Sequence, residues 1–261
     1  MIKKIKQKKL VFAIPCRNTG KRLFGKPVQF IDPARKVTVL EQLVRCIKKV
    51  NSVSDIVLGI SYGNENKIFE KIAKKNSIKF IYGKEYSPLE RVIQCAKKAK
   101  ATDVLRITSE CPFPYYELID KYWNMHKKTK ADGTFLENII DGCGFEIISL
   151  PSLIKSQKKS RAKRHLEDLT YYIRKNYKKF KINKFFGPKE LNRKDLRLTV
   201  DYPEDLALCR KVYKKFINQA PMFKIKSIVK FLDKNPALKK MIRPYVRAGY
   251  TSMYKWGKRM Y

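Results

Sequence analysis

The chain has 261 residues, and 60 Lys and Arg against 23 Asp and Glu give it a formal net charge of +37 at pH 7. Its 44% hydrophobic and 12% aromatic content excludes a disordered basic tail, because such chains lack the apolar side chains that offset the entropy of ordering. At this length we expect one α/β domain with a small appendage.

The positive charge is concentrated in three stretches. Residues 1–10 carry five Lys and no acid, residues 151–194 carry 15 basic and three acidic groups, and residues 223–261 carry 11 basic groups and one acid. Together they hold +27 of the +37. Such a field attracts any polyanion, whether nucleic acid, an anionic membrane or a phosphorylated substrate.

The six cysteines are scattered without the spacing of a zinc site or a disulfide framework. We therefore expect reduced thiols and a cytoplasmic protein. The apolar run at residues 10–15 is too short for a signal segment, and no stretch is long enough to span a bilayer, which leaves at most a peripheral attachment to a membrane.

Apolar runs of strand length alternate with segments of helical spacing in the first half of the chain. The predicted strands are residues 10–14, 56–60, 78–82 and 104–107, and the predicted helices lie at 40–50, 68–73 and 89–99. This alternation predicts a largely parallel sheet with helices on both faces. Ligands of such sheets bind beyond the carboxyl ends of the strands, so we expect functional residues just after these ends.

The second half begins with strand-like residues 134–150 and continues with two helices joined by a basic turn at 151–175. A late strand is predicted at 197–200 and helices at 204–217 and 225–232, the last stopping at Asn235-Pro236. We expect a main domain at 1–222, with residues 134–190 as its acceptor and dimer region. Residues 223–261 form a basic, aromatic, helical tail.

The loop after the first strand has the composition of a polyphosphate site. Residues 16–27 read C-R-N-T-G-K-R-L-F-G-K-P and contain four cations and two glycines. Glycines let the backbone approach an anion, and Arg and Lys neutralise phosphate oxygens. A P-loop is disfavoured although Gly20 to Lys26 fit its spacing, because Pro27 has no hydroxyl for magnesium.

Four segments in register resemble the sugar cytidylyltransferases, which make CMP-activated acidic sugars. The loop at 16–27 resembles A-R-x-x-S-x-R-L-P-G-K, and S-P-L-E-R at 87–91 resembles D-V-L-D-R. V-L-R-I-T-S-E-C-P at 104–112 resembles V-V-R-I-T-G-D-C-P, and R-L-T-V-D-Y-P-E-D-L at 197–206 resembles R-L-T-V-D-T-P-E-D-L. The pattern is nearest to the spore-coat-polysaccharide branch.

The resemblance implies a three-layer, Rossmann-like (GT-A-like) nucleotidyltransferase fold with a mixed, mainly parallel sheet. It implies an enzyme that joins CMP from CTP to an acidic sugar or related acceptor, releases pyrophosphate, and acts in surface-glycan biosynthesis. It also implies Mg²⁺ as cofactor and a homodimer.

The resemblance also assigns roles to particular residues. Lys21, Arg22 and Asp201 would be catalytic, with Asp201 binding magnesium and Glu110 at the place of a second metal ligand. The nucleotide would contact the loop and the two following motifs, through Arg17, Asn18, Thr19, Gly20, Lys21, Arg22, Lys26, Glu90, Arg91 and Arg106. Weaker candidates for the acceptor are Asp141, Glu146 and His165.

Three departures from the family pattern bear on the chemistry. Gly20 replaces Ser and so removes a hydroxyl contact, Phe24 replaces Pro, and Glu110 replaces Asp. The longer Glu side chain could alter a second magnesium site, because magnesium demands near-ideal octahedral geometry. One-metal chemistry through Asp201 then becomes plausible, and an inactive paralogue is the minority interpretation.

Several residues also have structural interpretations. Asp201 could cap the following helix; His126 is interpreted as a solvated residue at a helix end, and Cys16 and Cys111 as packing residues. The tail could contact an anionic membrane or stack on single-stranded nucleic acid, but packing of its aromatic rings on the domain or on a second subunit is favoured. The functional alternatives are a nucleotidyltransferase with another base or a phosphonate or polyol acceptor, and a non-catalytic nucleic-acid-binding protein.

Overall fold

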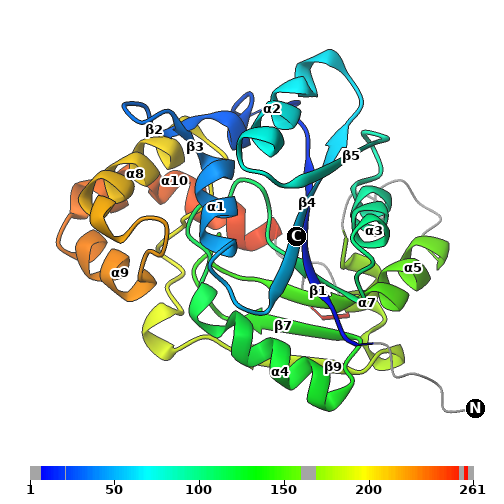
Figure 1. Cartoon of the computed structure of the whole chain (residues 1–261). Helices are drawn as coiled ribbons and strands as arrows, with labels where there is room; N and C mark the ends of the chain where they lie inside the picture. Colours follow the sequence, from blue (N-terminus) through cyan, green and yellow to red (C-terminus); the bar gives the residue numbers. More distant parts are fainter. Residues whose placement is uncertain (1–6, 21, 160–168, 253–255, 258–261) are drawn as a thin grey trace, which may run out of the picture.

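The computed structural model describes residues 7–20, 22–159, 169–252 and 256–257. Its main sheet has seven strands in the order β5-β4-β1-β6-β8-β7-β9, and β2 and β3 form a separate two-stranded sheet (Figure 1). The strands are β1 (Leu10–Cys16), β2 (Phe30–Asp32), β3 (Val37–Thr38), β4 (Val53–Ser61), β5 (Lys79–Gly83), β6 (Asp103–Arg106), β7 (Gly133–Glu137), β8 (Glu146–Ser149) and β9 (Ile182–Phe186).

The main sheet is mixed and mainly parallel. Parallel pairs join β1 to β4 and β6, β4 to β5, and β7 to β9, whereas β8 runs antiparallel to both β6 and β7. This arrangement confirms the predicted α/β fold. The four strands predicted in the first half are β1, β4, β5 and β6, and their carboxyl ends meet at one edge of the sheet.

Helices cover both faces of the sheet. They are α1 (Val39–Ile47), α2 (Lys67–Lys75), α3 (Pro88–Lys98), α4 (Ile119–Thr129), α5 (Leu150–Lys159), α7 (Tyr171–Lys175), α8 (Pro203–Lys215), α9 (Ile225–Asp233) and α10 (Pro236–Ser252). Successive side chains of a strand point to opposite faces. In β1, Val11 and Ala13 join the cluster with α3, α5 and α7, while Phe12 and Ile14 join the larger cluster with α1 and α8.

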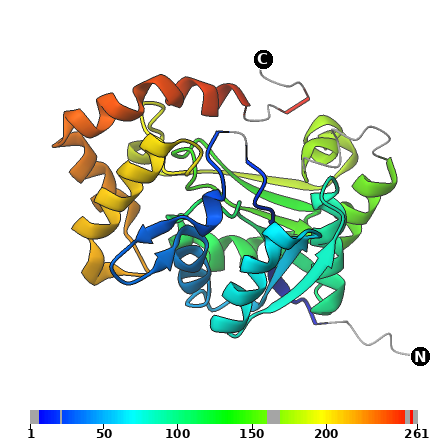
Figure 2. The ribbon, with the colours of Figure 1, turned by 90° about the horizontal axis from the view of Figure 1, so that it is seen from above.

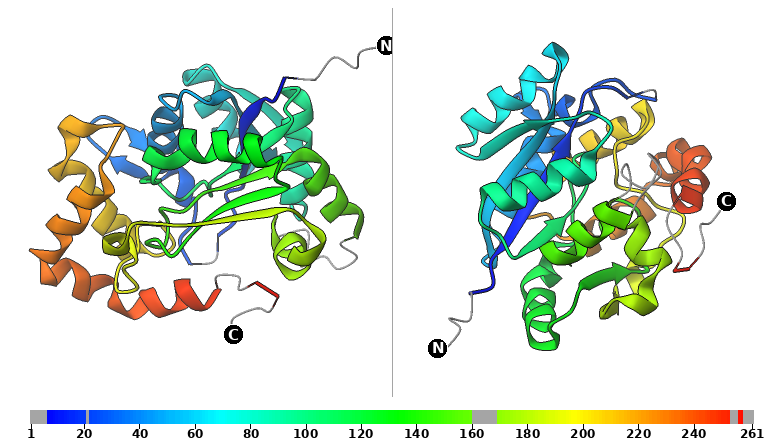
Figure 3. Two further views of the ribbon diagram at one scale, coloured as in Figure 1. Left: turned by 90° about the horizontal axis from the view of Figure 1, so that it is seen from below. Right: turned by 90° about the vertical axis from the view of Figure 1, so that its right-hand side faces the viewer.

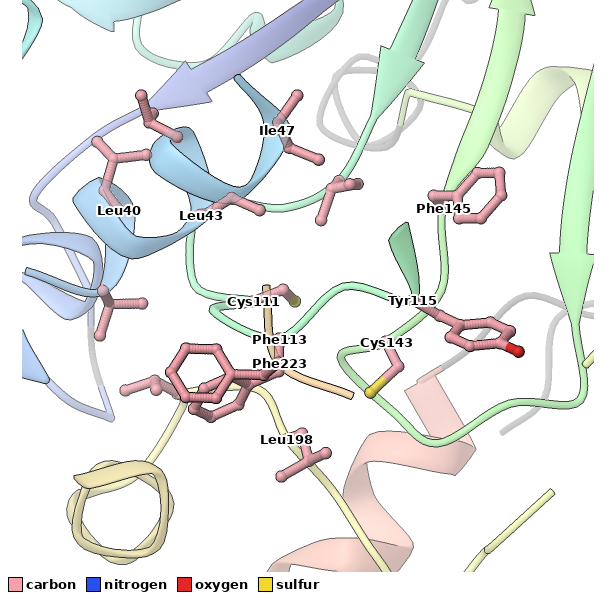
Figure 4. Packing of buried hydrophobic residues seen from close by; sticks show 14 of the residues in the cluster. Leu40, Leu43, Ile47, Cys111, Phe113, Tyr115, Cys143, Phe145, Leu198 and Phe223 are labelled. Carbon is pink, nitrogen blue, oxygen red and sulfur yellow. The ribbon is translucent and has the colours of Figure 1, made fainter. Parts of the chain in front are cut away.

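The C-terminal segment shares the larger core. Phe223 packs edge-on against Phe113 with ring centroids 5.1 Å apart, in the cluster that also contains Leu43 of α1 (Figure 4). The α9 helix ends before Pro236, as predicted, and α10 then runs along the outside of α8 and α9 (Figure 3). None of the helices in the described ranges is both long and apolar enough to cross a bilayer. The boundary at 222 stays a prediction.

Two sequence predictions about strands were wrong. Residues 197–200 lie in irregular structure within the described chain, and only Arg197 makes a bridge, to Asp141. Conversely, β9 was missed because its short apolar pattern is interrupted by Asn and Lys in a basic stretch. Residues 197–200 are buried without forming a strand, which leaves the same apolar pattern as a strand.

The interpretation of His126 was also wrong. Its side chain lies at the end of α4 but is fully buried, with Nδ1 2.8 Å from Thr134 Oγ1 and Nε2 3.0 Å from Asp103 Oδ1. Burial raises the pKa of Asp103, but the contacts with His126, Thr102 and Lys8 lower it more, so the net shift is downward. His126 therefore links α4 to β6 and β7 across the sheet.

Replacing His126 with Leu should destabilise the fold. The substitution removes one partner from each of two buried polar groups, and we expect it to lower the free energy of unfolding by about 2–3 kcal/mol in urea denaturation. The exposed neighbour substitution Lys128→Ala serves as control and should change it by less than about 0.5 kcal/mol. Equal stabilities of the two variants would contradict the structural role of His126.

Candidate active site

A cleft of about 870 Å³ opens at the carboxyl edge of the sheet. Its walls come from the loop after β1, the loop between β5 and α3, and the segment after β6. These are the places predicted for functional residues. The cleft brings together the predicted residues Arg17, Asn18, Thr19, Gly20, Arg22, Lys26, Arg91, Arg106 and Glu110.

Six predicted residues are not in the described lining of this cleft. Three of them, Asp141, Glu146 and Asp201, line a smaller adjoining cavity. Lys21 and His165 lie outside the described residues. Glu90 is in the first turn of α3 and is not in the described lining of the cleft; its Oε1 accepts a hydrogen bond of 3.5 Å from Gln94.

Asp201 is held by three cations. Its Oδ1 lies 2.5 Å from Lys26 Nζ and 2.7 Å from Arg22 Nη2, and its Oδ2 lies 2.8 Å from Arg197 Nη2. Burial raises the pKa of Asp201, but Lys26, Arg22 and Arg197 lower it more, so the net shift is downward and the carboxylate is ionised at neutral pH. The loop after β1 is thereby fastened to the start of α8 (Figure 2).

Arg197 organises the other side of this cluster. Its buried guanidinium pairs with Asp201 and, through Nε at 3.0 Å, with Asp205, and Nη1 donates to the carbonyl oxygen of Tyr245 at 2.7 Å. Asp205 Oδ2 in turn accepts from the backbone N–H groups of Asp201 and Tyr202, both at 3.0 Å. Asp205 therefore caps α8, and Asp201, which is not needed as the cap, lines the smaller cavity beside the cleft.

Sequence reasoning missed the part played by Arg197. The signal was present, because Arg197 opens the motif that ends in Asp201, four residues away. The burial of the Arg197 side chain depends on α10. The ring of Tyr245 in α10 stacks on Tyr202 with centroids 4.2 Å apart. Arg22 in turn lies over the Tyr202 ring at 5.1 Å, so the loop and α10 approach the start of α8 together.

Arg91 and Asn18 shape the cleft from within the protein. Arg91 Nη1 donates to the carbonyl oxygens of Cys16 and Gly59, both at 2.7 Å, and Nη2 donates to that of Glu85 at 3.2 Å. Burial lowers the pKa of Arg91. Asn18 is buried and donates through Nδ2 to Glu65 O at 2.7 Å. Both side chains fasten the cleft loops to neighbouring backbone.

Gly20 allows close approach of the backbone in this loop. A Cβ atom at Gly20 would lie 2.6 Å from Leu23 O, a distance that real Cβ atoms do not reach. The Ser of the family pattern therefore does not fit this loop conformation. Thr19, next to it, is exposed and donates through its hydroxyl to Glu85 Oε1 at 2.7 Å.

A second cavity of about 320 Å³ adjoins the cleft, and Arg106, Thr108 and Glu110 line both. The backbone N–H of Val200 donates to Glu110 O at 2.9 Å, which places the segments of Glu110 and Asp201 side by side. The lining of this smaller cavity contains five carboxylates, those of Glu110, Glu137, Asp141, Glu146 and Asp201.

Glu146, a predicted acceptor residue, is held by two arginines. Its Oε2 lies 2.9 Å from Arg106 Nη1 and its Oε1 lies 2.8 Å from Arg174 Nη2. Burial raises the pKa of Glu146, but the two arginines lower it more, and the net shift is downward. The Arg174 guanidinium lies over Phe135 at 4.5 Å and Trp256 at 4.9 Å, which confirms that one aromatic ring of the tail packs on the protein.

The pKa of Asp141, the other acceptor candidate, is shifted upward, whereas that of Glu146 is shifted downward. Burial raises its pKa to about 6 against the lowering effect of Arg197, and the charges of Asp201, Asp205 and Glu110 raise it further. The following Gly142 has φ +91, and a Cβ there would lie 2.5 Å from the backbone nitrogen of Thr199. This tight turn holds Asp141 against the segment that leads to Asp201.

The cysteines of the two nucleotide motifs do not have the setting of nucleophiles. Cys16 and Cys111 are buried. Burial raises the pKa of both thiols, that of Cys111 to about 12. Both therefore stay protonated and pack in the core, which agrees with the prediction.

The donor set fits a magnesium ion that arrives with a nucleotide. In the described part of the chain, no group of three or more His, Cys, Asp or Glu side chains could hold a metal. Asp201 and Glu110 are hard oxygen donors on adjacent segments. Magnesium usually takes one or two carboxylates and completes its shell with water and substrate phosphates.

Two curated relatives match most of the chain. No protein-family model matches the chain. An uncharacterized protein of Methanocaldococcus jannaschii is 30% identical over 233 residues, which cover 88% of this chain and 93% of that protein. The spore coat polysaccharide biosynthesis protein SpsF of Bacillus subtilis is 24% identical over 229 residues, which cover 87% and 95%.

Solved structures share the fold. A cytidylyltransferase from Leptospira borgpetersenii has a TM-score of 0.80 at 22% identity, covering 89% of this chain and 97% of that chain. A CMP:2-keto-3-deoxy-manno-octonic acid synthetase complexed with CTP has a TM-score of 0.62 at 14% identity, covering 80% and 99%.

The fold is the one that these cytidylyltransferase and synthetase structures share. With its matching relatives, the chain belongs to the sugar cytidylyltransferase family.

Replacing Arg197 with Lys should be far more costly than the same change at Arg193. Both arginines pair with two carboxylates, but the Arg197 side chain is fully buried and that of Arg193 is 24% exposed. We expect Arg197→Lys to lower the free energy of unfolding by about 3–5 kcal/mol. Arg193→Lys should lower it by about 1 kcal/mol or less. Urea denaturation measures both, and similar losses would refute the organising role of Arg197.

The Asp141→Asn variant should be more stable than the parent above pH 7 in EDTA. Because the pKa of Asp141 is raised to about 6 from 3.8, folding favours its protonated form, and that stabilisation is lost as the pH rises from about 4 through 6. The free energy of unfolding of Asp141→Asn should exceed that of the parent by an amount that grows over this pH range to about 2–3 kcal/mol. Urea unfolding at pH 4, 6 and 8 measures this difference. The exposed control substitution Glu117→Gln should give no such pH-dependent difference from the parent. A difference between Asp141→Asn and the parent that does not change with pH would contradict the prediction.

Proposed function

We propose that this protein transfers CMP from CTP to a hydroxyl group of an acidic sugar or related acceptor, with release of pyrophosphate, in surface-glycan biosynthesis. One observation carries the proposal: at the carboxyl edge of the sheet, the cationic loop that lines the cleft meets the carboxylate of Asp201, which lines the adjoining smaller cavity. The names of the relatives, which include a spore coat polysaccharide protein and a cytidylyltransferase, support the choice of nucleotide and pathway.

The cations of the cleft would bind the triphosphate. Arg17 is exposed in the cleft wall, and Arg22 and Lys26 reach the same space from the far end of the loop. A triphosphate competes with Asp201 for Arg22 and Lys26, because phosphate oxygens offer these side chains more negative charge than one carboxylate does. In this reaction positioning and charge stabilisation supply most of the catalysis, so these cations would steady the departing pyrophosphate.

Asp201, with Glu110 beside it, would hold the magnesium ion. When bound, the ion neutralises phosphate charge and polarises the phosphoryl group under attack. Once Arg22 and Lys26 contact the phosphates, Oδ1 of Asp201 becomes available as a ligand, while Arg197 keeps Oδ2 in place. Arg197 is therefore a positioning residue for this carboxylate.

The acceptor would enter the smaller cavity, next to Arg106 at the junction with the cleft. A neutral polyol is the second candidate for the acceptor. It is favoured by the five carboxylates in the cavity lining, since both Arg106 and Arg174 are already paired with Glu146. The homodimer and the cytoplasmic location stay predictions.

Pyrophosphate release with each nucleoside triphosphate, magnesium and a panel of acidic sugars and polyols tests the proposal. We expect turnover with CTP and little with UTP or ATP. Arg22→Ala should lower kcat/KM by about 10²–10³-fold, as for other groups that stabilise charge in the transition state. Asp201→Asn should remove turnover.

Arg193→Ala is the matched control, because it removes an arginine that pairs with two carboxylates outside the cleft. It should leave kcat/KM unchanged. A parent protein without CTP preference, or an Asp201→Asn variant as active as the parent, would disprove the proposed reaction.

A further inference from the structure

A groove on the outside of the molecule lies apart from the active site. It has a volume of about 770 Å³ and runs between α10 and the loop that follows the short helix Lys189–Leu191. Figures 2 and 3 show this yellow loop and the red α10 side by side. The groove shares no lining residue with the cleft or with the smaller cavity.

The groove carries positive charge that the protein does not balance. Its lining has a single acid, Asp195, which already pairs with Arg193 at 2.7 Å and with Lys239 at 3.6 Å. Among the described residues, Lys194, Lys240 and Arg243 have no acidic partner. All three are exposed, and α10 contains no Asp or Glu along its length.

The cations form one face of a firmly held helix. Lys240, Arg243 and Arg247 follow at intervals of three and four residues, so they lie on the same side of α10. The opposite side packs on the core through Ile242, which is fully buried. Tyr245 is also turned inward, since its ring stacks on Tyr202.

The composition of the groove distinguishes among anionic partners. Grooves that bind single-stranded nucleic acid combine cations with exposed aromatic rings on which bases stack. Here the described lining has no aromatic ring, and its uncharged members are Pro236, Ala237 and Val246. A flat row of cations beside a small apolar surface matches the phosphates and glycerol region of a phospholipid layer.

We propose that α10 docks this protein on an anionic phospholipid surface through Lys194, Lys240, Arg243 and the adjacent groove. Each basic residue near such a surface raises the partition coefficient about fivefold, which corresponds to about 1 kcal/mol, and salt screens the attraction. Docking would hold the active-site edge at the membrane, because Tyr245 O in α10 accepts the hydrogen bond from Arg197. The proposal does not depend on the proposed reaction.

Co-sedimentation of the full chain with vesicles tests the docking. The probes are vesicles of phosphatidylcholine alone and of phosphatidylcholine with about one-third phosphatidylserine, near physiological salt. We expect binding to the anionic vesicles only, and loss of that binding at high salt. The triple variant Lys194→Ala, Lys240→Ala, Arg243→Ala should lower the partition coefficient about 100-fold at about fivefold per residue.

The matched control removes the same charge elsewhere. Lys97→Ala, Lys98→Ala, Lys128→Ala takes three exposed lysines from α3 and α4, and it should keep the partition coefficient within about threefold of the parent. Thermal unfolding and CTP turnover of both triple variants should match the parent.

Three outcomes would overturn the proposal. The first is equal binding of the parent to neutral and anionic vesicles, and the second is an equal loss of binding in the two triple variants. The third is a parent that ignores vesicles but binds a single-stranded RNA oligonucleotide through the same three residues. A protein without CTP turnover that still docks would leave the proposal standing.

Discussion

The site depends on one carboxylate shared among three cations. Without Asp201, the charges of Arg22, Lys26 and Arg197 would repel one another across a few ångströms, at a cost of about 4 kcal/mol per close pair under the screening typical of a protein surface. With Asp201 ionised, the loop after β1 closes on the start of α8 before any ligand arrives. The cluster is thus preorganised for a polyanion, which can replace Asp201 as partner of the two loop cations.

The sheet explains why these groups meet. β1 is buried on both faces, because it packs on α3 on one side and on α1 on the other. This packing fixes the direction of β1 and the position of its carboxyl end along the edge of the sheet. Arg91 then joins the carbonyl oxygens of Cys16, Gly59 and Glu85, which fixes the ends of β1 and β4 relative to the next loop. Core packing places the loops, and buried polar bonds set their final positions.

Sequence patterns predicted what depends on local order along the chain. The alternation of apolar runs located four strands of the main sheet, and the motifs contain Arg22, Lys26 and Asp201, which the fold brings into contact. Sequence patterns failed to predict the burial of side chains that are covered by segments far away in the chain. His126 has the sequence neighbours of an exposed helix end, yet β6 and β7 cover it, and the importance of Arg197 depends on its contact with α10.

The net charge of +37 divides into two parts with different physical behaviour. Inside the site, cations have an acidic partner in contact: Arg22 and Lys26 share Asp201, and Arg106 pairs with Glu146. Partly buried pairs of this kind are screened little by salt, so they can select a ligand by geometry. Lys240 and Arg243 of α10 are exposed and have no acidic partner among the described residues, so they act over about a Debye length and respond to salt. The paired cations of the site therefore determine which ligand binds. The unpaired, exposed cations determine only which surfaces the protein approaches.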